Sequence, residues 1–398
     1  MPPSSSRAPV AVLGAGAMGR AAVFDLARSG QGVLLLDADA RAAESVARRY
    51  GGGRAAAARA DASEVAALAR RLRGAGVLVN CAPYRLNLHV MEAALRAGCH
   101  YIDLGGLFHM TRRQLALDRR FRRAGLLAVL GMGSAPGIVN VLARAAADPM
   151  RRVKSVRVYN GGADHTRYAS PLAFPFSPAT ILDEMTQRPL VFRRGRFVAV
   201  PPLSGAERYR FDLGVQTVHL SLHSEVATLP LTYRDKGLRE CSFRIAYDPA
   251  LLDRLRLLIA LGLADPRPGP RGVAPRDVLL DAFRRLPAPP ELVDDRDALS
   301  VVVEGVDERG PVVARCDLTA RPQREPPLSA VARDTGFPPA IVARMILGGG
   351  IAERGVRPPE QCVPVAPFLA ALAERGLRAR IRRRHGRPSR QGGRRTKG

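Results

Sequence analysis

The sequence predicts an α/β protein, a doubly wound parallel sheet followed by a second domain of mixed α+β structure. Two observations support this fold class. In residues 1–134, apolar runs without polar alternation are separated by amphipathic helical patterns, which is typical of parallel strands covered on both faces. From about residue 135 the pattern changes to alternating strands, a hairpin signal and capped helices.

The first region repeats a strand followed by a helix, and its first helical pattern closes at Gly30. The predicted strands lie near residues 9–13, 32–37, 55–60, 76–80, 99–103 and 126–130. The predicted helices lie over residues 18–29, 40–50, 63–73, 87–97 and 111–124. We therefore expect one parallel sheet with helices on both sides.

The second region predicts fewer and longer strands. They lie near residues 155–162, 188–200, 239–247 and 299–320, the last being a hairpin that turns across Asp307–Gly310. Helical patterns cover residues 178–185, 248–262 and 274–286, and Asp248 and Pro249 give the second of these an N-cap and a first turn. Two later helical patterns, at 334–350 and 365–376, are expected to pack on the first domain.

Composition excludes several classes of protein. The net charge is +26, but residues 378–398 contain ten Lys or Arg and no acid, and such a run predicts a solvated, disordered tail rather than a nucleic-acid surface. The five cysteines show no CxxC spacing, so neither a disulfide framework nor a metal site is indicated. The N-terminus lacks an apolar signal region, and glycines and proline interrupt the apolar stretch 126–147, so a cytoplasmic enzyme without a membrane span is expected.

The segment GAGAMG predicts a dinucleotide site of the Rossmann type. Gly14, Gly16 and Gly19 follow a strand and open a helix, where they permit a tight turn, a close approach of pyrophosphate and close helix packing. Asp37 ends the next strand, where a ribose would lie, and its charge favours NAD, although Arg41 leaves NADP possible. The other cofactor contacts are expected at the same sheet edge, from Ala17, Met18, Asn80, Ala82, Pro83 and Ser134.

The segment CHYIDLGG ends its strand on a carboxylate, Asp103, followed by two glycines. In an open α/β sheet, strand ends of this kind face the ligand crevice, so Asp103 is a candidate catalytic residue. The alternative is that Asp103 caps the turn at Gly105 and Gly106.

Four segments together resemble the saccharopine dehydrogenase (glutamate-forming) and lysine 6-dehydrogenase family. They are VLGAGAMGR, VLVNCAPYRLNLHVMEAALRAGCHYIDLGG, GMGSAPGIVNVLA and RGVRPPEQCVP. The resemblance implies a Rossmann domain (1–134), an inserted α+β domain that binds substrate and dimerises (135–327), and C-terminal helices that return to the first domain (328–377). The basic tail (378–398) lies outside the resemblance.

The resemblance also implies a reaction. Family members oxidise a carbon–nitrogen bond at or near a lysine side chain, with hydride transfer to the nicotinamide followed by imine hydrolysis. By this resemblance Asp103 would contact the amine, and Tyr84, Pro136 and Gly137 would lie beside the substrate. Arg244 would bind a carboxylate, unless it is a surface arginine.

The segment VHLSLHSE departs from lysine 6-dehydrogenases. Its alternation predicts a strand with His219, His223 and Glu225 on one face, too widely spaced to hold one metal ion, so no metal is expected. His223, with Glu225 near it, is then a candidate acid or base.

The leading hypothesis is an NAD(P)-dependent oxidoreductase acting on the C–N bond of saccharopine or L-lysine, as a homodimer. The alternatives are a carboxynorspermidine-type reductive condensation of an amine with a carbonyl, and a nucleotide-binding sensor without turnover.

Overall fold

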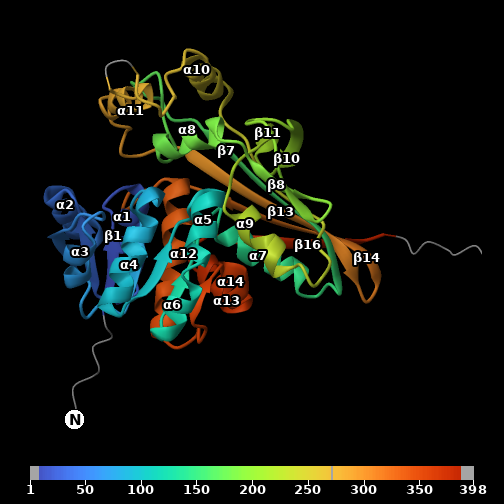
Figure 1. Ribbon diagram of the computed structural model, residues 1–398, viewed down its shortest axis with the longest axis horizontal. Coiled ribbons are helices and arrows are strands. Elements are labelled where there is room, and N and C mark those ends of the chain that lie inside the picture. Colours follow the sequence, from blue (N-terminus) through green and yellow to red (C-terminus); the bar gives the residue numbers. More distant parts are fainter. Residues whose placement is uncertain (1–8, 270–271, 387–398) are drawn as a thin grey trace, which may run out of the picture.

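Two sheets form the molecule, with helices between and around them (Figure 1). The structure, a computed structural model, describes residues 9–269 and 272–386. Seven parallel strands make the first sheet, in the order β15-β6-β5-β4-β1-β2-β3. They are β1 (Val10–Leu13), β2 (Val33–Asp37), β3 (Ala55–Arg59), β4 (Val77–Asn80), β5 (His100–Asp103), β6 (Leu127–Val129) and β15 (Gly355–Arg357).

Helices cover both faces of this sheet, as the unbroken apolar strands predict. One face packs on α1 (Ala17–Arg28), α2 (Ala40–Tyr50) and α12 (Ala330–Leu347). The other packs on α3 (Val65–Arg71), α4 (Asn87–Ala97) and α6 (Asp118–Arg123). The remaining helices of this domain are η1 (Tyr84–Leu86), α5 (Leu107–Leu115), α13 (Pro359–Cys362) and α14 (Val365–Ala373). The predicted helix 111–124 is therefore two helices, α5 and α6.

The order of strands reverses at β1, because β2 and β3 lie on one side of it and β4, β5 and β6 on the other. At such a point the loops after neighbouring strands turn away from each other and leave a crevice at the carboxyl ends. The loops after β1 and β4 lie on the two sides of this point.

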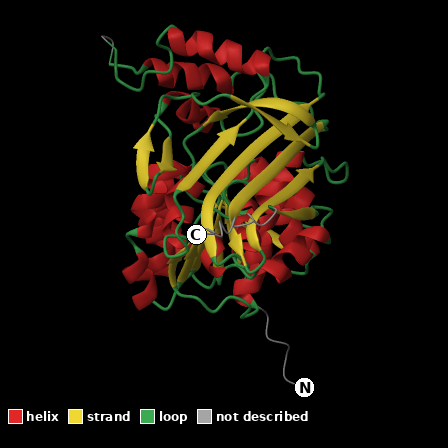
Figure 2. Ribbon diagram, turned by 90° about the vertical axis from the view of Figure 1, so that its right-hand side faces the viewer, coloured by secondary structure: helices red, strands yellow, loops and turns green. Residues whose placement is uncertain are grey.

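The second sheet has nine strands and lies in front of the first domain in the view of Figure 2. Its main path is β10-β11-β12-β7-β13-β14-β16, with β8 paired to β12 and β9 to β8. The strands are β7 (Arg152–Asp164), β8 (Leu190–Arg193), β9 (Arg196–Ala199), β10 (Glu207–Phe211), β11 (Gly214–Leu220), β12 (Glu240–Ile245), β13 (Asp295–Asp307), β14 (Gly310–Ala320) and β16 (Ala379–His385). The hairpin between β13 and β14 turns at Asp307 and Gly310, as predicted.

The described residues of this half form α7 (Ile138–Ala147), α8 (Pro178–Thr186), α9 (Glu225–Thr232), α10 (Pro249–Ala260) and α11 (Pro275–Arg284). Helices α8, α10 and α11 share a small apolar core at the top of Figure 1. Helices α7 and α12 contribute to a larger core that also includes residues of both sheets. The two domains are thus joined by one continuous apolar interior.

The chain returns to the first domain after β14, through α12 and then β15 at the edge of the first sheet. Helix α12 approaches α1 closely, since a methyl group at Gly336 would lie 2.5 Å from the Met18 carbonyl oxygen. The sequence patterns predicted the returning helices but not strand β15.

The prediction of a disordered tail over 378–398 is wrong for residues 379–385, which form β16 and pair with β14. The ladder runs from Ala379 opposite Leu318 to His385 opposite Val312. An arginine-rich strand escaped prediction because its partner lies some 65 residues earlier in the chain. Residues 387–398 lie outside the described residues.

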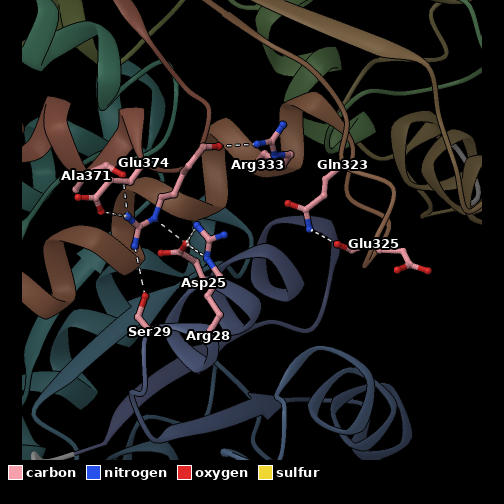
Figure 3. Close-up of polar contacts among 9 residues, drawn as sticks. Asp25, Arg28, Ser29, Gln323, Glu325, Arg333, Ala371 and Glu374 are labelled. Carbon is pink, nitrogen blue, oxygen red and sulfur yellow. Dashed lines mark hydrogen bonds and ion pairs between the residues drawn. The ribbon is translucent and has the colours of Figure 1, made fainter.

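Polar contacts fasten the end of α14 to α1 (Figure 3). The Arg375 Nε donates to Asp25 Oδ1 at 2.7 Å, and Arg28 binds the same oxygen at 2.9 Å. Arg333 donates to the Arg375 carbonyl oxygen at 2.6 Å. Asp25 and Arg375 are both buried, so this is an interior ion pair.

Among the described residues, no helix combines the length and the apolar character that a membrane span requires.

Candidate active site

The turn between β1 and α1 has the geometry that its glycines predict. Gly14 has φ +106°, and a methyl group at Gly19 would lie 1.8 Å from the Gly14 carbonyl oxygen, so helix and turn are in direct contact. A methyl group at Gly16 would meet nothing within 4 Å. The helix therefore begins beside open space at its N-terminus, where unpaired N–H groups attract phosphate.

Asp37 lies at the end of β2 next to this turn. Its Oδ2 accepts from the Ala15 N–H at 2.6 Å and its Oδ1 from the Asp39 N–H at 2.9 Å. Together with the open space at Gly16, this arrangement fits a nicotinamide dinucleotide, with the N–H groups of Ala17 and Met18 toward the pyrophosphate and Asp37 toward the ribose.

Asn80, a predicted cofactor contact at the end of β4, is buried instead. Its amide donates to Asn87 at 3.0 Å and to the Tyr101 hydroxyl at 3.1 Å, and its oxygen accepts from the Ala82 N–H at 3.1 Å. These bonds direct the Asn80 side chain inward, and its contact with a cofactor stays a prediction. Ala82 is half-buried and Pro83 is exposed, and both lie at the sheet edge.

Asp103 is also directed inward. It is 1% exposed, and its Oδ1 accepts from the Gly105 N–H at 2.9 Å and from the Gly131 N–H at 2.7 Å. Its Oδ2 accepts from three side chains, those of Tyr101, Asn87 and Gln114. Burial raises the pKa of Asp103, against the lowering effect of these donors. The turn-capping alternative describes these contacts, and a contact of Asp103 with the amine stays a prediction.

The turn at residues 131–137 packs against the same corner. A methyl group at Gly105 or Gly131 would lie 2.8 or 2.6 Å from the Pro136 ring, and the Gly137 N–H donates to Asn140 Oδ1 at 3.0 Å. Pro136 and Gly137 are buried and shape this turn, and their place beside the substrate stays a prediction.

Ser134 lies in this turn and is half-buried. Its hydroxyl accepts from the Thr335 hydroxyl at 3.3 Å, which joins the turn to α12. A cofactor contact of Ser134 stays a prediction.

His223 lies in the loop between β11 and α9. Strand β11 ends at Leu220 and α9 begins at Glu225, so the predicted strand through His223 is wrong, and His219 and His223 do not share a strand face. The His223 ring stacks on Phe243 of β12, with ring centroids 3.7 Å apart and an interplanar angle of 9°. His223 is 7% exposed.

Two glutamates border His223. Its Nδ1 forms a short hydrogen bond with Glu225 Oε2, and its Nε2 lies 3.9 Å from Glu184 Oε1 of α8. The Tyr247 hydroxyl donates to Glu184 Oε2 at 2.5 Å. Glu225 is 0% exposed, and its Oε1 has no hydrogen-bond partner among the described residues.

The two glutamates set the charge of this group. Burial lowers the pKa of His223, but Glu225 and then Glu184 outweigh it, and the pKa of His223 is raised. Burial raises the pKa of Glu184 to about 7, with further raising by Glu225. A buried histidine with a raised pKa, next to a carboxyl group whose pKa is about 7, can exchange a proton with a substrate.

Tyr84 connects the two domains close to this group. Its hydroxyl donates to Asp183 Oδ2 at 2.8 Å, and Arg85 binds both oxygens of Asp183. Arg276 lies 3.0 Å from Asp183 Oδ1. Asp183 is therefore neutralised by two arginines, whereas Glu184 beside it is not.

Sequence reasoning missed Asp183, Glu184 and Tyr247. One signal was available, because Asp183 and Glu184 are adjacent acids on an otherwise apolar helix, PATILDEMT. Acids at such positions are rarely buried without a partner.

Arg244 and His219 lie apart from His223. Arg244 donates to Ser242 at 2.8 Å and lies over the Tyr159 ring, on the opposite face of β12 from Phe243. Whether Arg244 binds a substrate carboxylate stays a prediction. His219 is buried at the end of β11, and burial lowers its pKa.

Comparisons with known proteins identify the family to which the chain belongs. Residues 10–129 match the model of the saccharopine dehydrogenase NADP binding domain, and residues 133–377 match that of the saccharopine dehydrogenase C-terminal domain. Carboxyaminopropylagmatine dehydrogenase of Synechocystis sp. is 26% identical over 93% of this chain and 96% of its own. Carboxynorspermidine synthase of Vibrio cholerae is 25% identical over 76% of each chain.

The structure of apo saccharopine dehydrogenase (L-Glu forming) from Saccharomyces cerevisiae has the same fold. Its TM-score is 0.71 at 16% identity, covering 95% of this chain and all of the yeast chain. The fold class and the resemblance drawn from the four sequence segments are confirmed. Because both domain models match and the Gly14–Gly19 turn has the geometry of a dinucleotide site, the chain belongs to the saccharopine dehydrogenase family and is an oxidoreductase that uses a nicotinamide cofactor.

Proposed function

We propose that this protein is an NAD(P)-dependent enzyme that forms or cleaves the C–N bond of a secondary amine. In the reductive direction an amine condenses with a carbonyl compound, water leaves, and the resulting imine gains a hydride at carbon and a proton at nitrogen. In the oxidative direction the same steps run backwards and end with hydrolysis.

One observation carries the proposal. The loop that holds His223 contacts the carboxyl end of β5, because the Gly106 N–H donates to Ser224 Oγ at 3.2 Å. The same sheet edge carries the dinucleotide turn, so His223 and a bound cofactor would lie at the same edge of the sheet.

His223 would hold or release the proton at the substrate nitrogen. Glu225 fixes the ring through Nδ1, which leaves Nε2 for the substrate, and Phe243 restricts the ring plane. A bound nicotinamide supplies or accepts the hydride. Burial of the group excludes water that would compete for the proton.

The charges around His223 favour a substrate that carries a second cationic group besides the reacting amine. Glu184 and Glu225 face His223 with no arginine bound to either among the described residues, and Arg244 lies on the other face of its strand. The names of the two relatives refer to carboxylated polyamines. We therefore place a polyamine precursor ahead of saccharopine or L-lysine as the substrate.

For the cofactor we propose NAD. Asp37 lies where the ribose hydroxyls would bind, and its carboxylate opposes a 2′-phosphate. A homodimer formed through the second domain and a cytoplasmic location stay predictions.

An absorbance assay at the reduced-nicotinamide band tests the proposal. Agmatine or another aliphatic diamine is offered with an α-amino acid aldehyde and NADH or NADPH, and L-lysine and saccharopine are offered separately with NAD or NADP. We expect consumption of NADH only with amine and aldehyde together. Turnover of saccharopine or L-lysine alone would restore the lysine hypothesis. Cofactor binding without turnover of any of them would favour a sensor.

A further inference from the structure

Asp103 anchors a corner of the main chain. Its Oδ1 binds the N–H groups of Gly105 and Gly131, which belong to the loops after two neighbouring strands, β5 and β6. Gly105 has φ +118°, and any side chain there would collide with Pro136. The corner therefore has one conformation, fixed by a buried carboxylate.

This corner holds Ser224 of the second domain. The Gly106 N–H and the Thr111 hydroxyl both donate to Ser224 Oγ, at 3.2 and 3.1 Å. The Ser224 hydroxyl donates in turn to the Leu107 carbonyl oxygen at 3.3 Å. Ser224 is 3% exposed, and all three of these partners come from the segment that follows β5.

Ser224 stands between His223 and Glu225 in the chain. A displacement of Ser224 would move both of its neighbours, since their main chains are joined to it directly. His223 and Glu225 are carried by the inserted part of the chain, whereas the corner belongs to the first domain.

We infer that Asp103 and Ser224 are positioning residues, through which the end of β5 sets the place of His223 and Glu225 relative to the sheet edge. This inference rests on the proposed function of that pair. Asp103 acts at a distance, by way of Gly105, Gly106 and Ser224, and neither residue exchanges a proton with the substrate.

The test uses the full chain with Ser224→Ala and Asp103→Asn. A misplacement of reacting groups by about 1 Å costs on the order of 100-fold in rate. We expect kcat to fall by about 10- to 100-fold in both variants, while the dissociation constant of NADH, measured by its fluorescence, stays within a factor of about two of the unaltered enzyme. The solvent deuterium isotope effect on kcat should rise, because proton transfer becomes slower than hydride transfer.

Ser155→Ala is the matched control. Ser155 is a buried serine of β7 whose hydroxyl has no hydrogen-bond partner among the described residues, so its removal should leave kcat and the isotope effect unchanged. Thermal unfolding of each variant shows whether it is folded.

A second measurement keeps the inference independent of turnover. Titration of the His223 imidazole by NMR should give a different pKa in Ser224→Ala from that in the unaltered chain, since the contact with Glu225 changes. If no substrate is turned over but this pKa shifts, the proposed function fails and the positioning role stands. Unchanged kcat, isotope effect and His223 pKa in folded Ser224→Ala would overturn the inference, as would loss of NADH binding in step with kcat.

Discussion

Replacing Glu184 by glutamine tests the electrostatic coupling on which the candidate site depends. The change keeps the shape of the side chain and removes its charge 3.9 Å from His223 Nε2. At an effective dielectric constant of about 20, two unit charges about 4 Å apart interact by about 4 kcal/mol, or about 3 pH units. Because the pKa of Glu184 is itself raised, to about 7, its charge is present only part of the time near neutrality. We therefore expect the pKa of His223 to fall by about 1–2 units.

The sign follows from the loss of an anion, which destabilises the imidazolium and lets the proton leave at lower pH. An NMR titration of the His223 ring measures the shift directly. In the oxidative direction, where neutral His223 accepts a proton, the acid limb of kcat/KM should move to lower pH by the same amount. Glu360→Gln is the control, because Glu360 is equally buried and has a raised pKa but binds Asn140 and Thr232 instead. A His223 pKa that stays fixed or rises in Glu184→Gln would refute the reasoning.

Four further changes have defined outcomes. Gly16→Ala should fold normally and weaken dinucleotide binding by about 10-fold or more, measured by fluorescence titration, because a methyl group there meets only the open space that phosphate would enter, whereas Gly19→Ala should fail to give folded protein. Arg375→Met should lower the free energy of unfolding by about 2–4 kcal/mol in a urea titration, since it leaves buried Asp25 with Arg28 alone; a loss below 1 kcal/mol would show that Arg28 compensates. Truncation after residue 378 removes β16 and should lower Tm by about 2–8 °C in a thermal melt, and an unchanged Tm would mean that this strand adds no stability.

The first domain was predictable from sequence because its signals are local. Buried parallel strands are apolar throughout, and the turn at Gly14, Gly16 and Gly19 depends on residues adjacent in the chain. The direction of a side chain at a strand end depends on residues that are distant in the sequence. Asp103 turns inward because the Gly131 N–H, from the next strand loop, completes its hydrogen bonds, and no spacing within CHYIDLGG encodes that partner.

The group around His223 shows the same limit. Glu184 meets His223 only because the inserted helix α8 packs beside the loop before α9, some 40 residues away along the chain. Alternation in VHLSLHSEVATL favoured a strand, yet residues 225–232 form a helix with an acid, Glu225, in its first turn. A first-turn acid after a serine is a helix-start signal, and it outweighed the alternation.

The return of the chain to the first sheet has a consequence for synthesis. Strand β15 and helix α12 complete the cofactor domain, but they follow nearly 200 residues of the second domain. During translation, the dinucleotide turn leaves the ribosome long before the helix that covers α1 through Gly336 exists. The cofactor domain of this enzyme is therefore finished last, and an N-terminal fragment ending before α12 leaves the apolar face of α1 open to solvent and to chaperones.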